Sequence, residues 1–439
     1  MADHAQSDDP AVQAQLDRLT MLSPGRDVLG LERISELMAR LGNPHRSLPP
    51  VFHVAGTNGK GSTCAFLRAS LEAAGKSVHV YTSPHLIRFN ERIRVAGKLI
   101  DDAVLAPLLS EVLDCSADIA PSFFEATTAA AFLAFARTPA DAAVIEVGLG
   151  GRLDATNVIE TPIACGIAQL GIDHQAFLGD DAVTIAGEKA GIAKPGVPLI
   201  GMAYPKPEAQ RIEEIAKAAG ASWHPKGRDW DAAPYRGQLH LRDAKGKLSV
   251  PLPRLPGAHQ AMNAALAIAM LRHQSVIEVP VAAIRAAMGW ADWPARLQRL
   301  SDGPLMALVP GVPIWIDGCH NPASAEVVTE QLDALIGKDT PLHIIAGVLA
   351  NKDAEGILTP FLGRAGSFHT VPIPGHPHHP AEELSAWLQS RGAEAEPAAD
   401  VGSALDSLAK GARRPGAILI LGSLYLAGEV LRENGERIE

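Results

Sequence analysis

Short apolar runs with the character of β-strands alternate with helical patterns along most of this chain, and this alternation restricts its fold more than any other feature. The strand-like runs of the first part are VFHVAG, SVHVYTS, DAAVIEVG, IACGIAQLG and VPLIGMA, and a later series consists of PIWIDG, PLHIIAGVL and AILILGS. Strands separated by helices pair in parallel, because each helix carries the chain back across a face of the sheet. The sequence therefore predicts an α/β fold with mostly parallel sheets in two units.

The length of 439 residues also favours two domains, since a single hydrophobic core rarely grows beyond about 250–300 residues. Between the two series lie a stretch typical of a β-hairpin, QLHLRDAKGKLSVPL, and the sequence WADWPARLQRL, where the proline favours a boundary. We expect a larger domain over residues 1–293 and a smaller, Rossmann-like α/β domain over residues 294–439.

Charge and cysteine content narrow the class of protein. With 39 basic and 49 acidic residues, the formal net charge of −10 disfavours a surface that binds nucleic acid. The four cysteines are scattered and lack metal-binding spacing, which favours a reduced cytoplasmic protein. The opening MADHAQSDDP is polar and acidic, unlike a secretory signal, and no apolar run approaches the length of a membrane span. We expect a cytoplasmic monomer that acts on small molecules, without nucleic-acid or membrane partners.

In VFHVAGTNGKGST a strand-like run leads through a glycine-rich turn into a helical pattern. This arrangement directs backbone N–H groups and a helix N-terminus at one point, where a phosphate group can bind. Lys60 can reach terminal phosphates, and the hydroxyl of Ser62 or Thr63 can bind magnesium. The alternative is an ordinary strand-turn-helix connection in which Lys60 is solvated. It stays open because the loop departs from the G-x-x-x-x-G-K-[ST] pattern at Val54 and at Gly61, which is inserted before Ser62. We predict a P-loop-type ATPase domain that binds ATP through Gly56, Thr57, Asn58, Gly59, Lys60, Gly61, Ser62 and Thr63.

The loop GTNGKGST and the following YTSPHLIRFNERIRV resemble the folylpolyglutamate synthase and dihydrofolate synthase family of the Mur-ligase superfamily. The likeness covers nearly the whole chain from about Leu16 and continues in family order through LGLERISELMARLGNP, FFEATTAAAF, VIEVGLGGRLDATN, GIDHQAFLGD, GEKAGIAKPG, LPGAHQAMNA, WPARLQ, DGCHNP, GVLANKD and GSLYLAG. It implies an ATP-dependent ligase that adds L-glutamate to dihydropteroate and to the γ-carboxyl group of reduced folates. The first domain would bind ATP and folate, and the second would be the C-terminal ligase domain.

Such a ligase transfers the γ-phosphoryl group of ATP to the acceptor carboxylate, and the glutamate amine then attacks the acyl phosphate. The resemblance gives catalytic roles to Lys60, Glu146, His174 and Lys189, and two Mg2+ sites to Ser62, Ser83, Glu146, His174 and Lys189, with a monovalent cation as a further candidate. From the residues alone, Glu146 ends an apolar strand, where a carboxylate can either hold a metal or cap the next turn. Alone, His174 would more often form a local hydrogen bond, and Ser83 before a proline is an ordinary turn residue.

The resemblance implies that Lys189 is carbamylated and that the resulting carboxylate helps to hold the second metal. Carbamylation requires the neutral amine, which costs roughly 4 to 5 kcal/mol at pH 7 unless the site lowers the pKa of the lysine. The alternative is an exposed lysine paired with Glu188, as is usual for a Glu-Lys dipeptide on a helix.

Further ATP contacts are implied on both sides of the boundary. Asp317 and His320 match family residues that approach the ribose and phosphates, while Asn263 and Arg296 match contacts to the adenine and to the phosphates, so that ATP would lie between the domains. Two small residues depart from the family pattern, namely Cys319 in place of alanine and Ala295 in place of glycine. Neither replacement argues against the fold or the function.

Arg88, Phe124 and Glu125 are candidates to line the folate pocket, although Phe124 is equally suited to core packing. We expect a bifunctional enzyme, with a monofunctional one as the alternative. A muramyl-peptide ligase would need an additional N-terminal domain, whereas the loop begins about fifty residues into the chain. A nucleotide-binding switch without catalysis would need the phosphate loop alone, and the full set of metal-binding candidates argues against it.

Overall fold

The computed structural model describes residues 5–22, 29–116, 118–411 and 415–438. The chain forms two compact units, one of Met1–Arg254 with His259–Asp292 and the other of Leu255–Ala258 with Trp293–Glu439. Of the opening stretch MADHAQSDDP, whose composition argues against a secretory signal, the first four residues lie outside the described residues. No helix in the described part of the chain is both long and apolar enough to cross a membrane.

An eight-stranded sheet organises the first unit, in the order β4-β3-β2-β5-β1-β6-β7-β8. Neighbours from β2 to β8 pair in parallel, whereas β3 is antiparallel to both β2 and β4. The strands are β1 (Val51–Ala55), β2 (Val78–Tyr81), β3 (Ile93–Val95), β4 (Lys98–Leu99), β5 (Ala142–Glu146), β6 (Ala164–Ile167), β7 (Pro198–Gly201) and β8 (Ser222–Pro225). Because β1 and β5 are buried along their whole length, they read as nearly continuous apolar runs in the sequence, with His53 and Glu146 as the polar residues.

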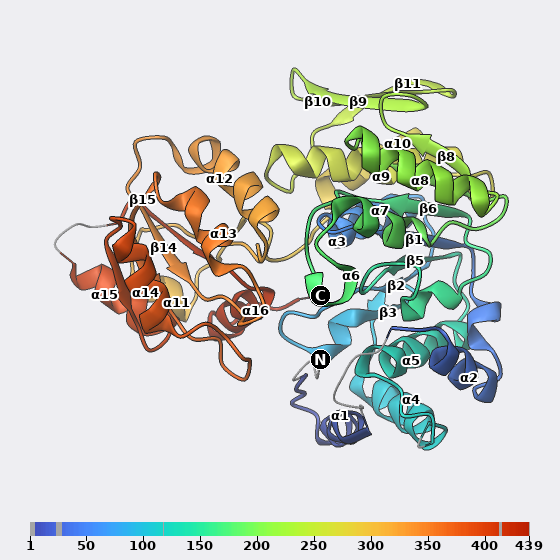
Figure 1. Ribbon diagram of the computed structural model, residues 1–439, viewed down its shortest axis with the longest axis horizontal. Helices are drawn as coiled ribbons and strands as arrows, with labels where there is room; N and C mark the ends of the chain where they lie inside the picture. Colours follow the sequence, from blue (N-terminus) through green and yellow to red (C-terminus); the bar gives the residue numbers. More distant parts are fainter. Residues whose placement is uncertain (1–4, 23–28, 117, 412–414, 439) are drawn as a thin grey trace. The chain divides into compact units, whose positions relative to one another are not determined.

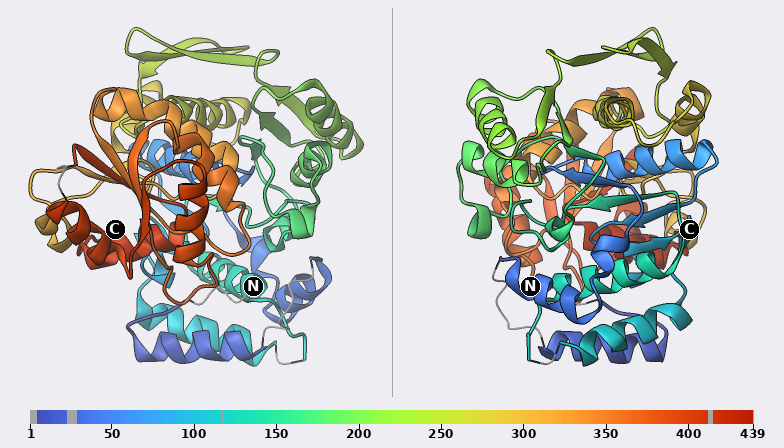
Figure 2. Two further views of the ribbon diagram at one scale, coloured as in Figure 1. Left: turned by 60° about the vertical axis from the view of Figure 1, so that its left-hand side comes forward. Right: turned by 90° about the vertical axis from the view of Figure 1, so that its right-hand side faces the viewer.

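Helices cover both faces of this sheet (Figure 1, Figure 2). One face shares a core with α1 (Pro10–Leu22), α2 (Glu32–Arg40), α4 (Asp102–Asp114) and α5 (Phe123–Arg137). The other face packs against α3 (Lys60–Ala73), α7 (Ala182–Ala190), α8 (Lys206–Ala218), α9 (Ala258–His273) and α10 (Val281–Trp290). The shorter helical turns are η1 (Pro44–Ser47), η2 (Phe89–Arg92), η3 (Ala155–Val158) and α6 (Gln175–Leu178). This layering leaves the carboxyl ends of the parallel strands along one edge, where ligands of open α/β sheets bind.

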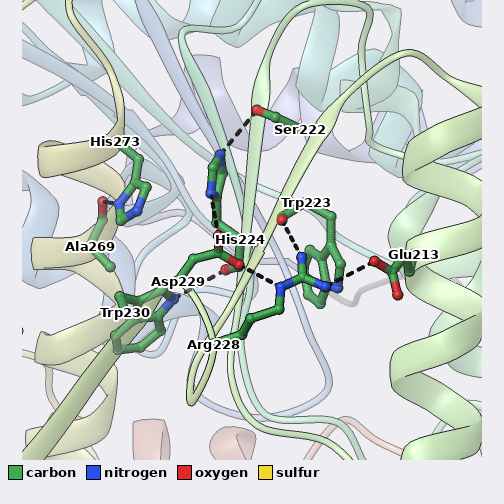
Figure 3. Close-up of polar contacts among 9 residues, drawn as sticks. All are labelled: Glu213, Ser222, Trp223, His224, Arg228, Asp229, Trp230, Ala269 and His273. Carbon is green, nitrogen blue, oxygen red and sulfur yellow. Dashed lines mark hydrogen bonds and ion pairs between the residues drawn. The ribbon is translucent and has the colours of Figure 1, made fainter. Parts of the chain in front are cut away.

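A separate antiparallel sheet follows β8 and consists of β9 (Trp230–Tyr235), β10 (Gln238–Asp243) and β11 (Gly246–Pro251). Pairing of β10 with β11 confirms the predicted hairpin. The turn before β9 is fixed by Arg228, whose guanidinium donates 2.8–2.9 Å hydrogen bonds to Glu213 on α8, to Asp229 and to the carbonyl oxygen of Trp223 (Figure 3). One arginine thus joins the small sheet to the helical layer.

The second unit contains a six-stranded sheet in the order β12-β13-β17-β14-β15-β16, parallel except for β12. Its strands are β12 (Gln298–Arg299), β13 (Ile314–Ile316), β14 (Leu342–Ala346), β15 (Ala365–Thr370), β16 (Ala395–Pro397) and β17 (Ala417–Leu421). Its helical elements are α11 (Pro304–Leu308), α12 (Pro322–Ile336), α13 (Ala354–Leu358), η4 (Thr359–Phe361), α14 (Ala381–Ser390), α15 (Val401–Lys410) and α16 (Leu424–Glu433). The predicted α/β class, with a second, smaller α/β unit, is confirmed.

Candidate active site

The predicted phosphate loop connects β1 to α3, as the sequence pattern indicated. The backbone N–H groups of Thr57 and Asn58 donate to the carbonyl oxygen of Gln169, at 2.8 and 3.1 Å. The Thr57 hydroxyl donates to the carbonyl oxygen of Gly171 at 2.8 Å. The loop is therefore tied to the segment that follows the neighbouring strand β6, at the carboxyl edge of the sheet.

Two glycines of the loop allow close packing that no other residue would permit. Gly56 and Gly59 have φ angles of 147° and 82°, which L-amino acids rarely adopt. A methyl group on Gly56 would overlap Ala168, and one on Gly59 would overlap the side-chain amide of Asn263 on α9. Asn263 also donates to Gln260 at 3.1 Å, so α9 contributes an amide directly against the turn of the loop.

We expect Gly59→Ala to lose nucleotide binding, because the added methyl group collides with Asn263 in addition to straining the backbone. Gly75→Ala is the matched control, since Gly75 has a φ of 76° but nothing within 4 Å of the position of the added carbon. Both changes should lower the free energy of unfolding by about 1–2 kcal/mol through backbone strain. Calorimetric titration with a non-hydrolysable ATP analogue separates them, and equal binding by both variants would contradict the collision.

Two side chains at the start of α3 contact the backbone of the phosphate loop. Lys60 Nζ donates to the carbonyl oxygen of Thr57 at 3.3 Å, which folds the ammonium back over the loop. The Thr63 hydroxyl donates to the carbonyl oxygen of Gly59 at 2.8 Å, so its proton is used within the first turn of the helix. Ser62 is buried beside it. Of the two hydroxyls predicted for magnesium, that of Ser62 is the one not already donating to the loop.

Glu146 lies at the carboxyl end of β5, directly beside the phosphate loop. Its backbone pairs in register with Val54 on β1, and its carboxylate accepts a 3.2 Å hydrogen bond from the N–H of Ser83 after β2. Burial raises the pKa of the Cys64 thiol on α3 well above its usual range; Glu146 adds to this shift and Lys60 opposes it. The structure therefore brings Glu146, Ser83 and Lys60 into one neighbourhood at the sheet edge.

Lys189 on α7 is almost fully buried, with 4% of its surface exposed. Its Nζ donates to the carbonyl oxygen of Gly56 at 3.0 Å. Glu188, the neighbour with which a surface lysine would pair, instead forms a 2.9 Å ion pair with Arg152. The alternative of an exposed lysine is therefore wrong. Desolvation, with a smaller contribution from the nearby Lys60 ammonium, lowers the pKa of Lys189 to about 7.

This depressed pKa should be visible in the stability of the protein. Below about pH 7 Lys189 is protonated in both the folded and unfolded chain; between about pH 7 and pH 10 only the unfolded chain holds the proton. The free energy of unfolding should therefore rise with pH in this window, by up to about 4 kcal/mol relative to Lys189→Met. Denaturant titrations in bicarbonate-free buffer test this, and parallel curves for the two proteins would contradict it.

His174 directly precedes α6 and has a left-handed backbone (φ 53°), and its N–H donates to the carboxylate of Asp173 at 2.7 Å. Asp173 raises the pKa of Lys189 against the effect of burial, which places this segment near the lysine. Sequence reasoning missed Asp173, and it also missed Asp154. The buried Asp154 accepts from the N–H groups of Leu149 and Thr156 at 2.8 and 3.0 Å, and thereby holds the loop that follows Glu146.

In the part of the chain that the structure describes, no group of three or more His, Cys, Asp or Glu side chains is arranged to hold a metal. The predicted oxygen donors beside the phosphate loop are the hydroxyls of Ser62 and Ser83 and the carboxylate of Glu146, with Lys189 nearby. Such a set fits Mg2+, which is commonly held by one or two carboxylates while substrate phosphates and water complete its oxygen ligands.

The three candidates for a folate pocket have different surroundings. Arg88 is exposed, whereas Phe124 is half-buried, lies 5.8 Å from the Tyr81 ring and covers Gly148 so closely that a side chain there would collide with it. Glu125 is buried at the start of α5, where its carboxylate accepts from the N–H of Ser122 at 2.7 Å in a capping box. It also accepts a 3.0 Å bond from Arg33, so its observed contacts stabilise the helix start.

In the second unit, three predicted residues gather where β13 ends. Asp317 is buried and accepts from the N–H of Leu297 at 2.8 Å; burial raises the pKa of its carboxyl group, and nearby Arg296 opposes this shift. His320 Nδ1 lies 3.0 Å from the carbonyl oxygen of Gly318. Ala295 has a φ of 56°, a conformation that glycine adopts without strain, so this departure from the family pattern costs roughly 1–2 kcal/mol.

Known proteins resemble the chain over most of its length. The family model described as "Dihydrofolate synthetase, C-terminal domain" matches residues 309–433. The dihydrofolate synthase/folylpolyglutamate synthase of Escherichia coli is 35% identical over 405 residues, covering 92% of this chain and 90% of that protein. The Bacillus subtilis protein of the same name is 36% identical over 345 residues, covering 75% and 77%.

Solved structures agree with these matches. E. coli FolC in complex with DHPP and ADP superposes with a TM-score of 0.87 at 33% identity, covering 97% of this chain and 98% of that one. Mycobacterium tuberculosis folylpolyglutamate synthase complexed with ADP gives a TM-score of 0.85 at 30% identity, covering 98% and 100%. The chain therefore belongs to the dihydrofolate synthase/folylpolyglutamate synthase family.

Proposed function

We propose that this protein is an ATP-dependent ligase that adds L-glutamate to dihydropteroate and to the γ-carboxyl group of reduced folates. The observation that carries the proposal is the meeting of Lys60, Glu146 and Lys189 around a glycine-rich loop at one edge of a parallel sheet. A related structure contains Mn, AMPPNP and L-glutamate, and E. coli FolC contains DHPP and ADP. These ligands are the metal, nucleotide, amino acid and acceptor classes that the reaction requires.

An amide does not form usefully from a carboxylate and an ammonium group in water, so the carboxylate must be activated. The acceptor carboxylate oxygen attacks the γ-phosphorus of ATP, the bond from that phosphorus to the bridging oxygen breaks, and ADP leaves. The neutral amine of glutamate then attacks the acyl carbon, phosphate leaves with the former carboxylate oxygen, and the nitrogen loses a proton. The protein contributes positioning and neutralisation of charge.

Within the first unit, Gly56, Thr57, Asn58, Gly59, Gly61, Ser62 and Thr63 would surround the phosphates with backbone N–H groups and hydroxyls. Lys60 would neutralise the charge that develops on the transferred phosphoryl group. Asn263 would reach the adenine side of the nucleotide from its place against Gly59. In the second unit, Arg296, Asp317 and His320 would contribute the ribose and phosphate contacts.

We assign two Mg2+ sites to Ser62, Ser83 and Glu146, and to His174 and Lys189. When bound, Mg2+ neutralises the phosphate oxygens and aligns them for transfer. Lys189 would serve as a carbamate, and its burial and depressed pKa favour this because about half of the amine is neutral near pH 7. A monovalent cation, a monomeric state and a cytoplasmic location remain proposals that rest on the resemblance and on composition.

The acceptor would meet Arg88 and Phe124, the first through its guanidinium and the second through its ring. Glu125 would act one step further away, by fixing the start of α5 from which Phe124 projects. A phosphate loop without acceptor chemistry would instead suit a nucleotide-binding switch, and a muramyl-peptide acceptor would suit the wider superfamily. Both alternatives predict no reaction with a pteroate or folate.

Side-by-side assays with dihydropteroate and with tetrahydrofolate test the proposal. Purified protein with ATP, Mg2+ and L-glutamate should convert both acceptors to products that are heavier by one glutamyl residue, as mass spectrometry would show. Conversion of only one acceptor would restrict the protein to a single activity. If neither acceptor is converted and the rate of ATP turnover does not depend on them, the result would favour a nucleotide-binding switch.

A further inference from the structure

The segment between β2 and β3 is built around one carboxylate that the proposed mechanism does not use. Glu91, in the short helical turn η2, accepts hydrogen bonds from three consecutive backbone N–H groups, those of Leu86 at 2.7 Å, Ile87 at 3.0 Å and Arg88 at 2.7 Å. Bonds from N–H donors to an ionised carboxylate are about twice as strong as neutral ones. The loop of residues 86–88 is thus held by one side chain.

The turn that carries Glu91 is itself anchored on both sides. Before it in sequence, the Asn90 side chain donates to the carbonyl oxygen of Ile100 at 2.8 Å and to the carboxylate of Asp102 at 2.7 Å. After it, the buried Arg92 donates to the His85 ring at 2.9 Å. Glu91 therefore connects the turn η2, which is fixed to the start of α4, with the loop of residues 86–88, which ends at the exposed Arg88.

Arg92 is further fixed by aromatic contacts. Its guanidinium lies 5.6 Å from the ring centres of both Phe89 and Phe123, a distance at which a cation attracts an aromatic face. Because Phe123 belongs to α5, the turn η2 is packed against the helix that also carries Phe124. Movement of η2 would disturb this aromatic packing, whereas the backbone N–H groups of residues 86–88 are held by the carboxylate of Glu91.

The longer segment of residues 83–88, which contains this loop, begins and ends at residues with proposed roles. Ser83, at its start, donates to Glu146, the proposed metal ligand, at 3.2 Å. Arg88, at its end, is exposed and is the proposed contact for the acceptor. The acceptor carries a carboxylate that must reach the phosphoryl group, so the distance between Ser83 and Arg88 matters to the reaction.

We propose that Glu91 is a positioning residue for the acceptor: by holding the N–H groups of residues 86–88, it sets the guanidinium of Arg88 against the anionic end of a pteroate or folate. This role rests on the proposed function. Glu91 touches no reacting atom and acts through the backbone of Arg88. The side-chain amide of a glutamine would present an N–H to some of the same donors, so even this isosteric change should release part of the loop.

The test is the kinetics of Glu91→Gln, Arg88→Ala and the double variant. Glu91→Gln should raise the KM for the acceptor about 10- to 100-fold while the KM for ATP and the melting temperature stay close to those of the unchanged protein. Glu111→Gln is the matched control, because it removes a carboxylate charge from an exposed pair with Arg137 on α4 and α5. It should leave both KM values unchanged.

The double variant separates positioning from a general structural effect. If Glu91 acts through Arg88, adding Glu91→Gln to Arg88→Ala should raise the acceptor KM no further. Additive effects, or an unchanged acceptor KM in Glu91→Gln, would overturn the role while the ligase activity of the parent protein stands. Glu91→Asp, which keeps the charge but shortens the reach, gives the same comparison if the glutamine variant does not fold. A parent protein without acceptor-dependent turnover would overturn the proposed function and this role together.

Discussion

Lys60→Ala is expected to lower the rate of amide formation by about 100- to 1,000-fold while the protein remains folded, because the change removes the cation proposed to neutralise the transferred phosphoryl group. The side chain lies over the phosphate loop and donates only to the carbonyl oxygen of Thr57 at 3.3 Å, so its loss leaves no buried partner charge. The measurement is the turnover of ATP with L-glutamate and acceptor, alongside a thermal unfolding curve.

Lys98→Ala is the matched control for this change. Lys98 is an exposed lysine on β4 in the same unit, and its removal alters the net charge equally. It should retain full turnover. Equal turnover by the Lys60 and Lys98 variants would refute the assignment of the phosphate loop.

Lys189→Ala is expected to lower turnover by about 100-fold or more, because it removes a proposed metal ligand together with the contact to Gly56. Short carboxylic acids such as acetate should restore part of the activity, since the truncated side chain leaves space near Gly56 in which a free carboxylate can replace the carbamate. The restoration should saturate with acetate concentration and be absent for the parent protein.

Two measurements check the carbamate in the Lys189 experiment. Carbon-13 NMR of the parent protein with labelled bicarbonate should show a carbamate resonance that the alanine variant lacks. Lys189→Met, which fills the buried site without a nitrogen, should be inactive and should not respond to acetate. Full activity of Lys189→Ala would rule out an essential carbamate.

The fold was predictable because the strands that define it are buried on both faces. Runs such as VFHVA in β1 and AILIL in β17 are apolar at every or nearly every position, so the period of the sequence and the burial in the structure agree. The hairpin of β10 and β11 was predictable from its turn residues. Strand β9 was not predicted, because its residues alternate little and include Pro234.

The candidate site was predictable only in part. The order of glycines, lysine and hydroxyls indicates a phosphate loop, but nothing in the dipeptide Glu188-Lys189 shows which side chain is buried. That outcome depends on the packing of α7, which directs Lys189 toward the carbonyl oxygen of Gly56, while Glu188 forms an ion pair with Arg152. Long-range packing of this kind has no local signal in a sequence.

Glu125, in contrast, has a local signal in the sequence. The pattern Ser122-x-x-Glu125 before an apolar run is the signature of a capping box, and the structure contains that box. The capping box is therefore readable from the sequence, and the folate contact of Glu125 stays a prediction. Local physical chemistry would have given the structural role of the carboxylate directly.

Phosphoryl transfer from ATP is expected to activate the acceptor carboxylate before glutamate attacks. Its most direct test uses dihydropteroate labelled with oxygen-18 in the carboxylate, together with ATP, Mg2+ and L-glutamate, and measures ADP, the glutamylated product and the mass of the released phosphate. We expect one ADP for each product formed, no ADP without the acceptor, and one oxygen-18 atom in each phosphate. Unlabelled phosphate, or ADP formed equally without the acceptor, would contradict the account.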